Sequence, residues 1–127
     1  MNHKKKTDVN QSEIVKYLRA FGVWVEVVSG AGRLTDLIVY KSEPAFLEVK
    51  VEGSKAVYTK IQLQFIADCK PPVGIVKTKE DALAFASNPR GLGLSQKQKD
   101  GLTGLILRNA GKQRFTPKEV SEAIDGK

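Results

Sequence analysis

The segment at residues 45–51, with the sequence AFLEVKV, limits the possible folds more than any other part of the chain. It has the composition of a buried strand, yet it carries a carboxylate, Glu48, and an ammonium, Lys50, two residues apart. Side chains alternate across a strand, so these two face one side of the sheet. The apolar residues that face the core are Leu47, Val49 and Val51. A Glu-x-Lys pair on a strand is also typical of an antiparallel sheet with one solvated face.

The surrounding sequence predicts an α/β domain with the element order α, β, β, β, α, β, α. Apolar residues recur at helical spacing before Gly22, and runs of β-branched and aromatic residues follow it. The short connections between the first three strands favour an antiparallel meander. We expect helices at residues 11–20, 59–67 and 79–86, and strands at 23–28, 35–40, 45–51 and 73–77.

A change of composition at residues 88–93 divides the chain into a core, residues 1–87, and a C-terminal helical extension, residues 88–127. Two further helices are expected in the extension, at residues 95–109 and 116–124. Thr116, Pro117 and Glu119 form the start signal of the second. We expect the extension to pack on the core or on a partner subunit. Residues 1–8 are expected to form a mobile basic arm, which either contacts phosphates or only aids solubility.

Charge and cysteine content narrow the functional classes. Lys and Arg outnumber Asp and Glu by 21 to 14 among 127 residues, a formal charge of +7 with a pI near 9.6. This favours a polyanionic partner, nucleic acid first, although a Lys-rich solvated surface gives the same balance. A single Cys69 and a single His3 exclude a Cys/His zinc site. No apolar run reaches membrane-span length and no signal peptide is recognisable, so we expect no membrane association and a cytoplasmic location.

Asp36 changes the interpretation of the Glu-x-Lys pair. It follows a loop with two glycines and begins the preceding predicted strand, although Asp is a poor strand former. In a short hairpin it would lie beside Glu48. Two carboxylates and a strand carbonyl are the oxygen ligands that Mg²⁺ prefers, and they leave positions for water and phosphate. An adjacent lysine would hold the attacking water and stabilise charge on the phosphate.

These residues resemble a known family. Asp36, the Glu48-Val49-Lys50 run and the segment TKIQ at residues 59–62, inside an αβββαβ order, are similar to the VRR-NUC family, the virus-type replication and repair nucleases of the PD-(D/E)XK superfamily. The resemblance implies a restriction-endonuclease-like core, a mixed central sheet flanked by helices. It implies Mg²⁺, with Mn²⁺ able to substitute, held by Asp36, Glu48 and the backbone carbonyl of Val49.

The same resemblance gives roles to other residues. Lys50 would serve the nucleophilic water, Gln62 would lie near the site, and Glu13 would join the acidic cluster. Gln62 is also consistent with a solvated helix residue, and Glu13 with a carboxylate that interacts with the dipole in the first turn of its helix. Arg33, Lys55 and Lys60 are candidate contacts to DNA phosphates, with solvated charges as the equal alternative.

The sequence therefore predicts a Mg²⁺-dependent DNA endonuclease that hydrolyses phosphodiester bonds with activated water and no covalent intermediate. By the resemblance, it would act on branched or junction DNA in replication or repair, in a virus such as a phage or in another mobile element. We expect a homodimer that presents two sites to the DNA. One alternative is a catalytically inactive DNA-binding module with the nuclease fold. The other is an α/β interaction domain whose charge only aids solubility.

Overall fold

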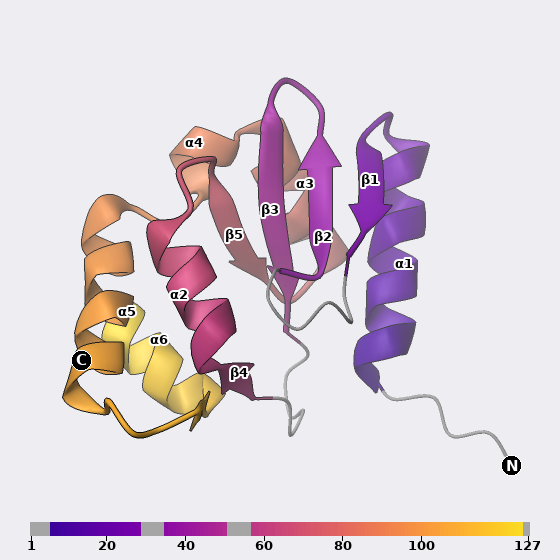
Figure 1. The fold of residues 1–127 in the computed structure, drawn as a ribbon. Coiled ribbons are helices and arrows are strands. Elements are labelled where there is room, and N and C mark those ends of the chain that lie inside the picture. The colour runs from indigo at the N-terminus through magenta and orange to yellow at the C-terminus, as the bar shows by residue number, and fades with distance from the viewer. Residues whose placement is uncertain (1–5, 29–34, 51–56, 126–127) are drawn as a thin grey trace, which may run out of the picture.

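A four-stranded mixed sheet forms the centre of the molecule (Figure 1). The computed structural model describes residues 6–28, 35–50 and 57–125. The strands of this sheet, in spatial order, are β1 (Trp24–Val27), β2 (Leu37–Tyr40), β3 (Pro44–Val49) and β5 (Val73–Val76). The first three are antiparallel, and β5 lies parallel to β3. The α/β class and the predicted meander are confirmed.

Helices α1 (Lys6–Ala20) and α3 (Lys79–Ser87) cover one face of the sheet. Side chains from these helices and from the strands form one buried core, which includes Ile14, Leu18, Val25, Leu37, Val39, Leu47 and Phe85. Gly22 ends the first helical segment with a φ of 82°, a left-handed conformation that favours glycine. The prediction of a mobile arm is wrong for residues 6–8, which belong to α1. Residues 1–5 lie outside the described ranges.

Helix α2 (Lys60–Asp68) covers the opposite face over β3 and β5, and it connects the two parallel strands. A capping box fixes its start: the Gln62 N–H donates to Thr59 Oγ1, and the Thr59 N–H donates to Gln62 Oε1, both at 3.1 Å. Phe65 of α2 contacts Phe46 of β3, with ring centroids 5.0 Å apart. The face that carries Glu48 is therefore not an open, solvated face.

The C-terminal residues form a second layer on α2. Helix α5 (Gln96–Arg108) packs against α2, and α6 (Pro117–Asp125) packs against α5. Their buried residues form one core with α2 and Tyr58. The predicted start of α6 is confirmed, because the Thr116 N–H donates to Glu119 Oε1 at 2.9 Å and the Glu119 N–H donates to Thr116 Oγ1 at 3.1 Å.

Three short elements were not predicted from the sequence. A second sheet pairs β4 (Tyr58–Thr59) with β6 (Arg114–Phe115), and α4 (Pro89–Leu92) follows α3. Each is too brief to show a hydrophobic period. The β4–β6 pair has a structural consequence, because it ties Tyr58 and the start of α2 to the C-terminal layer.

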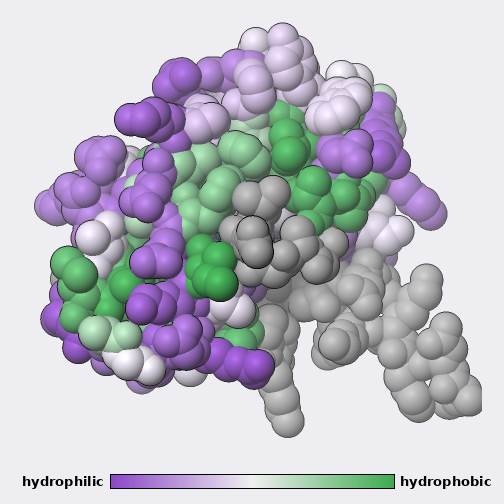
Figure 2. Space-filling model, in the orientation of Figure 1, coloured by the Kyte–Doolittle hydropathy of each residue, from purple (hydrophilic) through white to green (hydrophobic). Residues whose placement is uncertain are grey.

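Helix α2 lies over β3 and β5, so it leaves the same face of the sheet uncovered over β1 and β2 (Figure 1). Figure 2 shows hydrophobic residues on this face of the sheet. Trp24 and Tyr40 are cross-strand partners there, 55% and 49% exposed. The expected homodimer stays a prediction. Among the described helices, none has the length and apolar character needed to cross a bilayer.

Gly101 allows α5 and α6 to approach closely, because a Cβ at this position would collide with the backbone carbonyl oxygen of Ala123. We expect Gly101→Ala to lower the free energy of unfolding by roughly 1–3 kcal/mol. Gly104 lies on the same helix, and a Cβ there would meet only the end of the Arg108 side chain. Gly104→Ala should therefore stabilise the protein by about 0.5–1 kcal/mol. Urea unfolding of both variants measures this difference, and equal effects would contradict the packing described.

Candidate active site

Asp36 and Glu48 lie opposite each other at the end of the β2–β3 hairpin. The antiparallel register pairs Leu37 with Leu47 and Ile38 with Phe46, and one further step pairs Asp36 with Glu48. Directly opposite residues on one face of an antiparallel pair have Cβ atoms roughly 4.5–5.5 Å apart. The Val49 N–H donates to Asp36 Oδ2 at 2.8 Å, which fixes the aspartate side chain. The hairpin therefore brings the two predicted acids together.

The Val49 carbonyl is directed to the same place. In a strand, the N–H and C=O of one residue point to the same edge. The Val49 N–H bonds Asp36, whereas the next N–H, that of Lys50, donates to the Val76 carbonyl on the other side at 2.9 Å. The carbonyl oxygen of Val49 is therefore directed toward the side of Asp36. This is the third oxygen that the resemblance assigns to the metal.

Lys50 is held between an acid and an aromatic ring. Its Nζ lies 2.9 Å from Glu48 Oε2 and 4.1 Å from the ring centroid of Tyr58. The Tyr58 residue is 2% exposed, and the Lys50 side chain is 13% exposed. A cation over an aromatic face is attracted by the ring quadrupole, more so where water is excluded. The ammonium is therefore fixed beside the carboxylates.

Glu48 is buried with one oxygen unsatisfied. The residue is 1% exposed, and within the described part of the chain its Oε1 has no hydrogen-bond partner. Most buried polar atoms in proteins have such a partner, because an unpaired one costs free energy. An unpaired carboxylate oxygen beside a second carboxyl group is an arrangement that a proton or a metal ion would stabilise.

Burial and mutual repulsion shift the protonation of both acids. The pKa of Glu48 is raised to about 7. Burial is the largest cause and the negative charge of Asp36 the second, while Lys50 lowers the pKa. Burial also raises the pKa of Asp36, against the lowering effects of the Val49 N–H and of Lys50. In the absence of a cation the two carboxyl groups therefore share a proton more readily than isolated acids do.

The donor set fits a hard divalent cation. Two carboxylates and one backbone carbonyl supply oxygen ligands only, which suits Mg²⁺ or Mn²⁺, and the remaining positions would go to water and a phosphate. No group of three or more His, Cys, Asp or Glu residues suitable for a metal occurs within the described ranges. The candidate site has two carboxylates, so it suits an ion that also binds substrate rather than a fully protein-enclosed one.

Gln62 and Lys60 both lie in α2, and each makes a hydrogen bond to a residue outside that helix. The Gln62 side-chain oxygen accepts the Thr59 N–H in the capping box, so this part of the amide serves the helix start. The Lys60 ammonium donates to the Ala110 carbonyl at 3.3 Å in an exposed position. Their predicted roles at the active site and toward DNA stay predictions.

The predicted place of Glu13 in the acidic cluster stays a prediction. Glu13 is exposed on α1 and lines a hollow of about 200 Å³ together with Lys77 and the start of α3. Helix α1 begins at Lys6, so Glu13 is not in the first turn and the interpretation through the helix dipole is wrong. Arg33 and Lys55, the other predicted DNA contacts, fall outside the described residues.

Two residues near the site were not singled out from the sequence. Tyr58 contacts Lys50, and its only signal is its position directly before the Thr59 cap. Lys77 follows β5, and the parallel register that pairs Val49 with Val76 continues to pair Lys50 with Lys77. The signal for Lys77 is the alternation of β5, which places Lys77 on the same face as Ile75. This signal points to the site only once β5 is known to pair with β3.

The raised pKa of Glu48 predicts how stability depends on pH in the metal-free protein. A folded-state pKa above the ordinary value of 4.5 means that folding favours the protonated acid, so this stabilisation is present at low pH and is lost as pH rises to about 7. We expect the free energy of unfolding of the wild type in EDTA to fall across this window relative to Glu48→Gln, by roughly 3 kcal/mol, as followed by thermal unfolding. Parallel pH profiles for the two proteins would contradict the assignment.

Comparison of the chain with protein-family models, with curated proteins and with solved structures finds no match. The resemblance to the VRR-NUC family therefore stays a prediction, and the functional argument depends on the residues of the site themselves.

Proposed function

We propose that the protein is a Mg²⁺-dependent DNA endonuclease with a PD-(D/E)XK-type core and a VRR-NUC-like active site. The observation that carries this proposal is that half-buried Asp36 lies opposite buried Glu48, with Lys50 ion-paired to Glu48. Adjacent acids that are withdrawn from water and have raised pKa values are uncommon in purely structural sites and are frequent where chemistry requires them.

The energetics of the acid pair favour a functional explanation. Burying like charges side by side is unfavourable, and replacing such groups by apolar residues of similar volume is often neutral or stabilising. Strand β3 nevertheless contains Glu48 between Leu47 and Val49, in the interior of the protein. A purely structural role does not explain why the two acids lie side by side. A divalent cation shared with a substrate phosphate would offset their repulsion.

Each residue of the candidate site would have a separate role in phosphodiester hydrolysis. The chemistry that Mg²⁺ supplies when bound is polarisation of the phosphate and activation of water. Asp36, Glu48 and the Val49 carbonyl would hold the ion. The Lys50 ammonium would orient the attacking water and stabilise the negative charge that grows on the phosphate oxygens. Tyr58 would keep this ammonium in position and exclude bulk water from it.

The charge of the chain supports a nucleic-acid substrate. A formal charge of +7 gives sequence-independent attraction to phosphates, and binding of this kind weakens steeply with salt. Arg33, Lys55 and Lys60 stay the proposed contacts to the DNA backbone. Selection of branched or junction DNA, a role in viral or mobile-element replication or repair, a cytoplasmic location and a homodimer belong to the same proposal.

A cleavage assay with linear, flapped and four-way DNA tests the proposal. We expect cleavage in Mg²⁺ or Mn²⁺ and none in EDTA. Asp36→Asn, Glu48→Gln and Lys50→Ala should each reduce the rate by about 10²-fold or more, because each removes a group that acts on the transition state. DNA binding should persist in these variants and should fall steeply as salt increases.

Glu26→Gln is the matched control for this assay. Glu26 lies on β1 on the same face of the sheet, but it is exposed and opposite Ile38 rather than a second acid. This variant should cut DNA at the wild-type rate. Salt-sensitive binding without any cutting would favour the inactive DNA-binding module. Metal-independent cutting, or full activity in the three site variants, would contradict the mechanism.

A further inference from the structure

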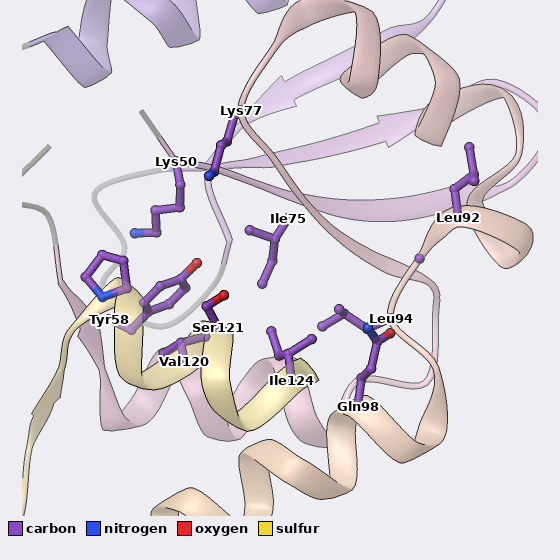
Figure 3. Close-up of a pocket in the computed structure, with 12 residues that line it drawn as sticks. Lys50, Tyr58, Ile75, Lys77, Leu92, Leu94, Gln98, Val120, Ser121 and Ile124 are labelled. Atoms are coloured by element: carbon purple, nitrogen blue, oxygen red, sulfur yellow. The ribbon is translucent and has the colours of Figure 1, made fainter. Parts of the chain in front are cut away.

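A cavity of about 360 Å³ opens beside the candidate active site and extends along β5 next to helix α6, with one end at the carboxyl ends of β3 and β5 (Figure 3). Lys50, Lys77 and Tyr58 line one end of it. Lys50 is also the residue paired with Glu48, so the cavity and the site share a wall. The carboxyl ends of parallel strands are a common location for ligand sites in sheets with crossover helices.

The two ends of the cavity differ in chemistry. In Figure 3 the side chains of Leu94 and Ile124 lie together, beyond Ile75 as seen from the ammonium groups of Lys50 and Lys77. An ammonium has three N–H donors, so Lys50 can keep its ion pair with Glu48 and also donate to an anion. The cavity therefore suits a ligand with a negatively charged group at one end and an apolar body at the other.

The volume of the cavity and its position beside the candidate active site indicate which class of ligand it binds. The volume lies at the small end of the roughly 300–1,000 Å³ range of small-molecule pockets, which excludes a duplex or a helix but accepts a single nucleotide. A nucleotide has an anionic phosphate and a flat base whose faces pack on apolar side chains. A strand whose phosphate lies at Lys50 would direct its neighbouring base toward Ile75 and Ile124.

We propose that this cavity binds one unpaired nucleotide of the DNA next to the scissile phosphate, with the phosphate at Lys50 and Lys77 and the base among Ile75, Leu94 and Ile124. This inference rests on the proposed nuclease function. It gives the C-terminal layer a role in substrate selection, because Leu94 and Ile124 come from residues beyond α4. Extruding a paired base costs a few kcal/mol, so DNA that is already unpaired at this position is the preferred substrate.

A fluorescent base tests the occupant directly. The probe is a single-stranded oligonucleotide with one 2-aminopurine, a base whose emission rises when it leaves the stack, with Ca²⁺ in place of Mg²⁺ to prevent hydrolysis. We expect a severalfold rise in emission when the wild type binds. Ser121→Trp should abolish the rise, because Ser121 lines the cavity and the larger ring fills it.

Glu122→Trp is the matched control on the same helix, since Glu122 is exposed and is not a lining residue of this cavity. It should give the wild-type rise. A second pair of variants guards against a misfolded Ser121→Trp protein. Lys77→Ala should weaken binding of the probe severalfold, whereas Lys70→Ala, an exposed lysine away from the cavity, should not. Deoxyadenosine monophosphate should compete for the cavity and reduce the emission.

The outcomes separate this inference from the proposed function. Cleavage of DNA by a wild type whose binding leaves 2-aminopurine emission unchanged would overturn the cavity assignment and leave the nuclease assignment intact. A rise that Ser121→Trp abolishes, in a protein that does not cut in Mg²⁺, would support the nucleotide site and reject catalysis. Competition by decanoate, with none by deoxyadenosine monophosphate, would assign the cavity to an acyl anion and overturn the inference, as would a failure to bind the oligonucleotide.

Discussion

The juxtaposition of two carboxyl groups, half-buried Asp36 and buried Glu48, is the constraint on which the functional account depends. The β2–β3 register sets them opposite each other, and the Val49 N–H holds the aspartate in place. Two acids in this position repel each other, and burial adds to the cost of their charge. The fold keeps them there without a full set of partners for Glu48 in the described residues. A bound hard cation, as proposed, would resolve this conflict.

The parallel crossover gives the acid pair its surroundings. Helix α2 connects β3 to β5 on the face that carries Glu48, which is buried, and the parallel pairing of the two strands brings Lys77 beside Lys50. The β4–β6 pair then sets Tyr58 against Lys50 and anchors the C-terminal layer. The same strand ends therefore position a candidate metal site, a fixed ammonium and an adjacent cavity. Residues of the β2–β3 hairpin and of the β3–β5 crossover therefore lie together at one end of the sheet.

Local patterns predicted the hairpin part of this site and missed the rest. The alternation of β3 places Glu48 and Lys50 on one face, and the short β2–β3 connection brings Asp36 beside them, so these residues were found from the sequence. Glu48 is buried by tertiary packing, which no local pattern reveals. Lys77 became a neighbour only through the parallel pairing of β5. The start of α1 was missed because residues 6–10 are mainly polar and show no apolar period.

Calorimetric titration of the purified protein with Mn²⁺ tests the central claim most directly, because it measures the ion and not the reaction. The account predicts saturable binding by the wild type that is lost in Asp36→Asn, where one of the two proposed carboxylate ligands becomes an amide. Substitution of an acid outside the site, as in Glu43→Gln, should leave binding unchanged, since Glu43 pairs with Arg90 at 3.0 Å in the turn before β3. A wild type that binds no ion, or an Asp36→Asn variant that binds it equally well, would contradict the account.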